Sequence, residues 1–192
     1  DDMNIDIEQI NDFLLKHENE QILIFGFTFV VFENFIKKLQ ASNTKLNLTN
    51  SILIHGGGWK KLAENAIDNS SFKALIKEWS GISRVFNYYG LVEQTGSIFM
   101  ECENENLHAS IYSDIIFRKP EDFSVCDIEQ EGIVQLVSLL PQSYPGHSIL
   151  TEDIGKLVGV DNCPCGRKGK YFKIFGRIKN AEIRGCSDTI QK

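Results

Sequence analysis

Hydrophobic and polar residues in the first half of the chain follow the periods of alternating strands and helices. Short apolar runs predict three buried strands, at residues 21–25, 51–55 and 84–89. Residues 29–40 have helical spacing with Thr28 as the expected N-cap, and residues 71–79 have the same spacing, with Gly81 placed to end the helix. Because helices connect the successive strands, the pattern predicts a parallel sheet with flanking helices.

The second half has a different pattern, since strand-like stretches follow one another from Ser97 onward without a convincing amphipathic helix. The predicted strands cover residues 98–101, 108–118, 132–140 and 170–175. No repeat or flexible linker separates the two halves. We therefore predict an α/β fold in which residues 1–96 form the α/β part and residues 97–192 the β-rich part of one continuous body.

Composition narrows the class of protein. The chain has 192 residues, of which 42% are hydrophobic, and a formal net charge of -6. This excludes a disordered chain and argues against a nucleic-acid partner, which usually requires a basic face. The longest apolar run, residues 22–32, is well short of the roughly 20 residues that cross a bilayer, so we expect no membrane span. The number of cysteines, five, is odd and argues against a disulfide framework. We therefore expect the protein to reside in the reducing cytoplasm.

Glycines follow two of the predicted strands, at the ends where open parallel sheets bind ligands. Gly56, Gly57 and Gly58 would let backbone amides approach a flat or anionic ligand, although such a run is also a common plain turn. In the segment NYYGLVEQTG, Tyr89 suits ring stacking and Glu93 suits a hydrated divalent cation. Taken alone, this segment is equally compatible with a surface loop.

Two further positions could contact a polar ligand. The carboxylate of Asp153 could bind vicinal hydroxyls, and the guanidinium of Arg177 could bind a phosphate or carboxylate with two hydrogen bonds. Each is, by itself, more often part of a turn or a surface ion pair.

The cysteines suggest a metal site. Cys102 and His108, with five residues between them, and the pair Cys163 and Cys165 supply three thiolates and an imidazole, a full set for tetrahedral zinc. The alternative is that the cysteines are small buried hydrophobes and the histidine a hydrogen-bonded strand residue. Cys186 differs, because Arg184 lies two positions earlier and could favour a nucleophilic thiolate; an unremarkable tail cysteine is the other interpretation.

In this order, the motifs HGGGWKKL, YYGLVEQTG, ILTEDIG and FGRIKNAEIRG resemble the later part of an adenylate-forming enzyme. Within that superfamily the chain is most similar to the LuxE acyl-protein synthetase family, through SLLPQSYPGHSILTEDIG, CPCGRKG and EIRGCSD. Phenylacetate-CoA ligases look similar around the Cys/His pairs and the glutamate motif. The resemblance covers roughly residues 22–188.

The resemblance implies that a carboxylic acid, expected to be a fatty acid, reacts with ATP to give an acyl-adenylate, from which the acyl group passes to a thiol. It implies cofactor contacts at Gly56, Gly57, Gly58, Tyr89, Gly90, Thr95 and Asp153. Glu93 would hold Mg²⁺, Arg177 would contact ribose or phosphate, and Cys186 would accept the acyl group. In the ligase relatives, residues placed like the Cys/His set hold structural zinc.

Several positions depart from the superfamily pattern. Val92 replaces the usual phosphate-binding Thr or Ser, Glu152 replaces a glycine, and Asn180 stands near the usual hinge aspartate. No phosphate loop is present upstream. We therefore expect the C-terminal portion of a larger protein, inactive without its N-terminal half, with an acyl reductase as a possible partner. A phenylacetate-type CoA ligase and a non-catalytic, zinc-stapled binding module are the alternatives.

Overall fold

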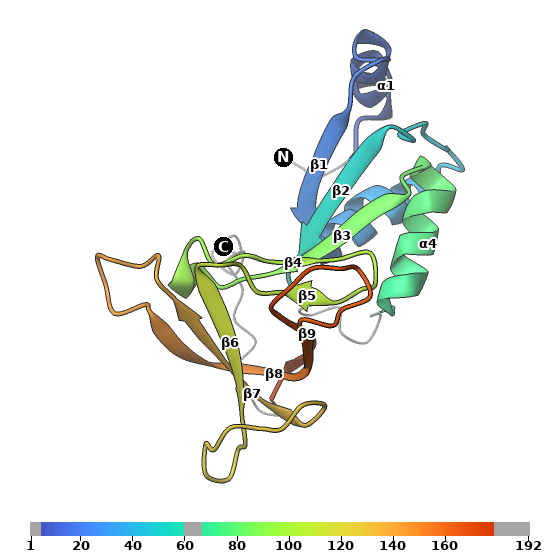
Figure 1. The fold of residues 1–192 in the computed structure, drawn as a ribbon. Helices are drawn as coiled ribbons and strands as arrows, with labels where there is room; N and C mark the ends of the chain where they lie inside the picture. Colours follow the sequence, from blue (N-terminus) through green and yellow to red (C-terminus); the bar gives the residue numbers. More distant parts are fainter. Residues whose placement is uncertain (1–4, 60–66, 179–192) are drawn as a thin grey trace, which may run out of the picture. The chain divides into compact units, whose positions relative to one another are not determined.

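The computed structural model describes residues 5–59 and 67–178 and divides into two compact units, with the boundary between Phe86 and Asn87 (Figure 1). The first unit combines helices with parallel strands, whereas the second is built from antiparallel strands. The predicted α/β class is therefore confirmed. Among the described residues, no helix has the length and hydropathy needed to span a bilayer.

The first unit is organised around two parallel strands, β1 (Ile22–Phe27) and β2 (Ser51–Gly56). Ile22 lies opposite Ser51, and Phe27 lies opposite Gly56. The strand β3 (Arg84–Tyr89) begins in this unit and ends in the second. The parallel pairing that the sequence predicts is thus found between β1 and β2. The chain continues from the end of β2 through the glycines at residues 56–58.

Two helices of the first unit are capped by aspartates. α1 (Ile7–Lys16), which the sequence analysis did not predict, begins after Asp6, whose carboxylate accepts a hydrogen bond from the Gln9 amide at 2.9 Å. α4 (Asn69–Ser80) begins after Asp68 in the same way and ends at Gly81, which has the left-handed backbone (φ 76°) that favours glycine. The predicted helix at residues 71–79 and its glycine stop are confirmed.

The predicted helix at residues 29–40 differs in detail. It consists of α2 (Thr28–Val30), the π-helix η1 (Val31–Ile36) and α3 (Lys37–Ala41). The assignment of Thr28 as the N-cap is wrong, because Phe27 occupies that position and makes no side-chain cap. The hydroxyl of Thr28 is buried and lies 2.9 Å from His55 Nδ1 and 3.1 Å from the Gly56 carbonyl, so neighbouring β2 takes the hydrogen bonds that a cap would make.

The second unit is an antiparallel sheet in which the strands run in the order β4-β5-β9-β8-β7-β6. Their bounds are β4 (Phe99–Glu101), β5 (Leu107–His108), β6 (Ser113–Arg118), β7 (Glu131–Ser138), β8 (Ser148–Val160) and β9 (Lys170–Arg177). The end of β3 joins this sheet, with Tyr89 opposite Phe99. From Ser97 to Ile178 the described chain contains no helix, as predicted.

Two strands differ from the sequence prediction. The single strand expected at residues 108–118 is divided, because β5 pairs with β9 while β6 pairs with β7. β8, the longest strand of the unit, was not predicted at all. It carries Thr151, Glu152 and Asp153, so these residues lie in a strand and not in a surface loop.

Candidate functional site

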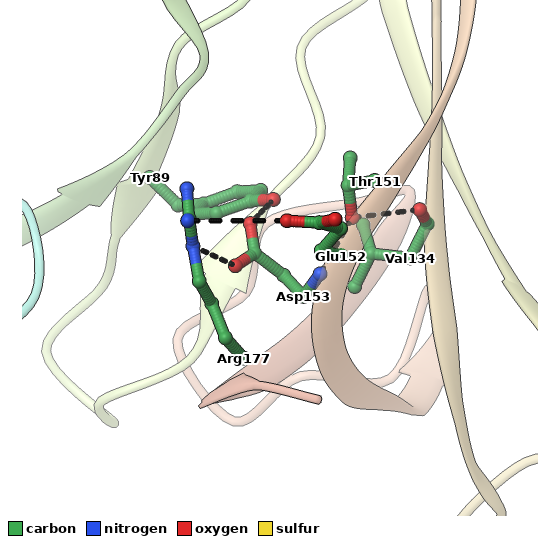
Figure 2. A network of polar contacts seen from close by, with 6 residues as sticks. All are labelled: Tyr89, Val134, Thr151, Glu152, Asp153 and Arg177. Carbon is green, nitrogen blue, oxygen red and sulfur yellow. Dashed lines mark hydrogen bonds and ion pairs between the residues drawn. The ribbon is translucent and has the colours of Figure 1, made fainter. Parts of the chain in front are cut away.

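A short hydrogen bond joins the end of β3 to β8 (Figure 2). The Tyr89 hydroxyl donates to Asp153 Oδ2 at 2.6 Å. Burial of the ring, and then the negative charge of Asp153, raise the pKa of Tyr89 well above its usual value. The phenol therefore remains a neutral donor and holds one oxygen of the carboxylate in place.

The backbone around Asp153 is fixed by Thr151. The Asp153 amide donates to Thr151 Oγ1 at 3.0 Å, and the Thr151 hydroxyl donates to the Val134 carbonyl of β7 at 2.9 Å (Figure 2). The side chain of Asp153 is 14% exposed. The carboxylate is thus anchored through both its backbone and one oxygen. Thr151 belongs to the motif ILTEDIG but was not predicted as a site residue, although a threonine two positions before an aspartate is a recognisable local hydrogen-bonding pattern.

Arg177, at the end of β9, lies opposite Asp153 in the strand register. Its Nε is 3.8 Å from Asp153 Oδ1, and its NH1 is 3.9 Å from a carboxylate oxygen of Glu152 (Figure 2). The guanidinium is 44% exposed. Exposed ion pairs at such distances contribute little to stability, so exchanging them for contacts with an anionic ligand costs little.

The structure thus brings Tyr89, Asp153 and Arg177 together in a cluster that we name the nucleotide site, after the ligand that we propose for it. An aromatic ring, an oriented carboxylate and a guanidinium are suited to a ligand with a flat ring, vicinal hydroxyls and a negative charge. Such a ligand has the chemistry of a nucleotide.

Glu93 lies four residues beyond Tyr89 in the same unit. It is exposed in the short 3₁₀ helix η3 (Val92–Gln94), where a hydrated cation could reach it. The Thr95 hydroxyl donates to the Val92 carbonyl at 3.1 Å and so closes this turn. Gly90, just before it, has no room for a side chain without adjustment, because a Cβ would lie 3.0 Å from the Ser97 carbonyl oxygen.

The glycines at residues 56–58 belong to the first unit and begin at the last residue of β2, with Gly57 in the left-handed region (φ 79°). Beside them, His55 is 2% exposed, and its Nδ1 lies 2.9 Å from the Thr28 hydroxyl. Burial, and then the charge of Lys73, lower the pKa of His55 to about 4. This histidine is therefore neutral at pH 7 and supports the backbone at the entry to the glycine run.

The predicted metal ligands form a second cluster, which we call the metal cluster. The ligand atoms of Cys102, His108, Cys163 and Cys165 all lie within 4.8 Å of one another. The two sulfurs of Cys102 and Cys163 are 3.9 Å apart, and Cys165 Sγ is 3.5 Å from His108 Nε2. Tetrahedral zinc with its usual bond lengths requires separations of about 3.8 Å between sulfurs and about 3.5 Å between sulfur and nitrogen.

Hydrogen-bond donors around the metal cluster point at its sulfurs. The Arg167 amide lies 3.4 Å from Cys165 Sγ, and the buried Asn106 side chain donates to Cys163 Sγ at 3.7 Å. Burial, followed by the charge of Arg167, lowers the pKa of His108 and favours the neutral imidazole that a metal needs. These residues fit a structural zinc ion. Asn106 was missed in the sequence, where its position between the first two ligands was the available signal.

One sequence prediction falls on a part of the chain that the structure does not describe. Cys186, with Arg184 and Asn180, lies outside the described residues.

Comparisons with known proteins show the family and the fold of the chain. The family model for acyl-protein synthetase, LuxE, matches residues 2–192. No curated protein matches the chain. Among solved structures, a 2-hydroxyisobutyryl-CoA ligase in complex with 2-HIB-AMP and CoA matches 82% of this chain and 34% of its own length, with a TM-score of 0.63 and 18% identity.

Two other ligases share the fold. Apo MatB from Rhodopseudomonas palustris covers 91% of this chain with a TM-score of 0.58 and 15% identity, over 34% of its own length. A long-chain-fatty-acid-CoA ligase from Archaeoglobus fulgidus covers 91% with a TM-score of 0.59 and 11% identity, over 37% of its own length. The chain therefore spans about a third of the length of these ligases.

Proposed function

Because the chain belongs to the LuxE acyl-protein synthetase family, we propose that it is the nucleotide-binding portion of an enzyme that activates a carboxylic acid with ATP and passes the acyl group to a thiol. The observation that carries this proposal is the contact of Tyr89, Asp153 and Arg177 in the second unit. The same three groups would bind adenine, ribose and phosphate of one nucleotide.

In the proposed first step, a carboxylate oxygen of the acid attacks the α-phosphorus of ATP, and pyrophosphate leaves. Asp153 would accept hydrogen bonds from the ribose hydroxyls through Oδ1, since Tyr89 already occupies Oδ2. Arg177 would offset negative charge near the phosphate or ribose. Glu93 would hold Mg²⁺, which offsets the charge of the departing pyrophosphate.

In the proposed second step, a thiolate attacks the acyl carbonyl carbon and AMP leaves, so that a thioester replaces the mixed anhydride. Cys186 is our candidate for this thiol. A fatty acid as substrate, an acyl reductase as the receiving partner and a cytoplasmic location complete the proposal. The remaining part of a longer protein would supply the phosphate loop, since the chain spans about a third of its structural neighbours.

Zinc has a structural part in this proposal. The metal cluster joins the turn after β4 to the turn between β8 and β9, and a single ion there would fasten the two hairpins together. The zinc would take no part in the reaction.

Nucleotide binding tests the first step directly. We expect AMP and a nonhydrolysable acyl-adenylate mimic to raise the melting temperature of the chain, because both bind the folded state. Asp153→Asn should abolish this shift. Asp114→Asn is the matched control, since Asp114 forms an ion pair with Lys170 in the same unit but lies outside the nucleotide site. A chain that binds neither ligand would instead fit a non-catalytic, zinc-stapled binding module.

The acyl acceptor requires a separate test with the full-length protein and radiolabelled fatty acid. Cys186→Ser should remove the acid-stable, hydroxylamine-sensitive acyl label from the protein. Cys126→Ser is the control: it changes a buried cysteine of the second unit and should retain the label. Persistent transfer to added CoA by the Cys186→Ser variant would refute the protein-acylating route and favour a phenylacetate-type CoA ligase.

A further inference from the structure

A buried glutamine, Gln94, connects the turn that carries Glu93 to the neighbouring chain. Gln94 is completely buried, with 0% of its surface exposed, and its Nε2 donates to the Gly146 carbonyl at 2.8 Å. The same nitrogen lies 3.5 Å from the Leu136 carbonyl of β7. A primary amide has two N–H donors, so this side chain can serve both carbonyls at once.

A second contact joins the turn that carries Glu93 to the segment that contains Gly146. The Thr95 amide donates to the hydroxyl of Tyr144 at 3.3 Å. Tyr144 and Gly146 belong to the turn at residues 144–147, which we call the YPGH turn. This turn lies in the middle of the motif SLLPQSYPGHSILTEDIG. The proposed function assigns no role to it.

The YPGH turn has close internal contacts. The Gly146 amide donates to the Tyr144 carbonyl at 2.8 Å, and a Cβ at position 146 would lie 2.2 Å from Tyr144 Cε2. Only glycine allows the tyrosine ring to lie so close to the backbone. At its far end, the His147 carbonyl accepts from the Ser138 amide, which ties the turn to the end of β7.

We propose that Gln94 is a positioning residue for Glu93 and that the YPGH turn is the platform on which it acts. This inference rests on the proposed function, in which Glu93 holds Mg²⁺. η3 is only three residues long, and a turn so short has little intrinsic stability. The buried amide of Gln94 fixes the backbone of the exposed Glu93 so that its carboxylate is already placed when the cation and nucleotide arrive.

The signature of such a role is a loss of the magnesium-dependent part of ATP affinity. We would titrate ATP into the full chain by calorimetry, in magnesium-free buffer and at saturating Mg²⁺, and take the ratio of the two affinities. Gln94→Met keeps the length of the side chain but removes its donors. We expect the ratio to fall about tenfold while the affinity for metal-free ATP stays unchanged.

Two further variants separate positioning from folding. Tyr144→Phe changes a side chain that is 41% exposed and removes only the contact with Thr95, so it should fold and lower the ratio about threefold. Gln130→Met is the control, because the Gln130 side chain accepts a hydrogen bond from the Asp127 amide before the start of β7, away from the YPGH turn, and the variant should leave the ratio unchanged.

Glu93→Gln distinguishes failure of the inference from failure of the proposed function. If Glu93→Gln abolishes the magnesium-dependent gain but Gln94→Met and Tyr144→Phe preserve it, the positioning role is wrong and the proposed function stands. If the unaltered chain binds ATP without any magnesium-dependent gain, the assignment of Glu93 in the proposed function is wrong. Equal losses of affinity with and without Mg²⁺ in Gln94→Met would also overturn the positioning role.

Discussion

The metal cluster and the nucleotide site lie at opposite ends of the β8–β9 hairpin and are built in opposite ways. At one end, the turn at residues 161–169 joins Val160 to Lys170 and carries two of the cysteines. At the other end, Asp153 lies opposite Arg177. In the metal cluster four ligand atoms of the kinds that bind zinc lie within 4.8 Å of one another, whereas in the nucleotide site a carboxylate already bonds to a phenol and pairs with a guanidinium.

The cysteines of the metal cluster are also more deeply buried than Arg177 of the nucleotide site. Cys102 is 0% exposed and Cys163 is 5% exposed, while the side chain of Arg177 is 44% exposed. A structural ion is held by protein donors that share one centre. A ligand that enters and leaves needs groups that can exchange internal contacts for contacts with the ligand. This difference supports the proposed stabilising role of the metal end and the proposed ligand exchange at the nucleotide end.

Two irregularities of the hairpin lie between these ends. The register of β8 against β9 shifts between Ile154 and Gly155 and again between Leu157 and Gly159. Such bulges bend a strand and increase its twist locally. If these bulges separate the two ends of the hairpin, loss of the metal leaves nucleotide binding unchanged. If they do not, loss of the metal changes the affinity for the nucleotide.

The largest effect is expected from loss of a metal ligand. Cys163→Ser should eliminate bound zinc and lower the free energy of unfolding by on the order of 3 kcal/mol or more, because the ion contributes its binding free energy to folding. Elemental analysis and urea unfolding check this. Cys126→Ser is the control, since this buried cysteine bonds to the Glu131 carbonyl outside the cluster and should keep the zinc. A Cys163→Ser chain that retains a full equivalent of zinc would contradict the metal cluster.

Removing the metal from the unaltered chain tests the coupling between the two ends. We expect chelation to weaken AMP binding about tenfold, within the range typical of coupled sites, because β8 and β9 carry both the turn at residues 161–169 and the Asp153–Arg177 pair. Calorimetric titration of AMP before and after chelation measures this, and restoring zinc should restore the affinity. An unchanged affinity would mean that the two register shifts separate the ends.

The two ends also differ in how far the sequence could predict them. Each half of the metal cluster is local, since its ligands lie within single turns and use residue types with few other roles. The Tyr89–Asp153 contact joins residues 64 positions apart, and no local pattern indicates it. What the sequence did indicate at this site came from the order of motifs that resemble a family.

The same reasoning applies to the fold. The positions of β1, β2 and β3 were predictable because short continuous apolar runs are typical of strands. The expected burial of β1 is wrong, because Leu23, Phe25 and Phe27 on one face of it are exposed. β8 was missed because only Gly155 and Gly159 are buried along it, so the strand has little hydrophobic alternation to detect. Thr28 was assigned as a cap because a propensity cannot reveal that a buried partner, His55, competes for its hydroxyl.

Within the nucleotide site, Tyr89→Phe should weaken AMP binding roughly fivefold to tenfold. The ring that would stack on adenine remains, but the charge-assisted hydrogen bond that orients Asp153 is lost, which corresponds to about 1–1.5 kcal/mol. Equilibrium binding of AMP measures the change, with Tyr112→Phe, a tyrosine 54% exposed, as the control. Tighter binding by Tyr89→Phe would mean that the phenol competes with the ribose for Asp153.

The smallest effect is expected one contact further from the ligand. Thr151→Val preserves the shape of the side chain but leaves the Asp153 amide and the Val134 carbonyl without the hydroxyl that joins them. Because Tyr89 still holds the carboxylate, AMP affinity should fall only about twofold to threefold, while the free energy of unfolding falls by about 1 kcal/mol. AMP titration and urea unfolding of the same preparation separate the two quantities. If Thr151→Val reduced affinity more than Tyr89→Phe, the backbone of β8 and not the phenol would be the main determinant of where Asp153 lies.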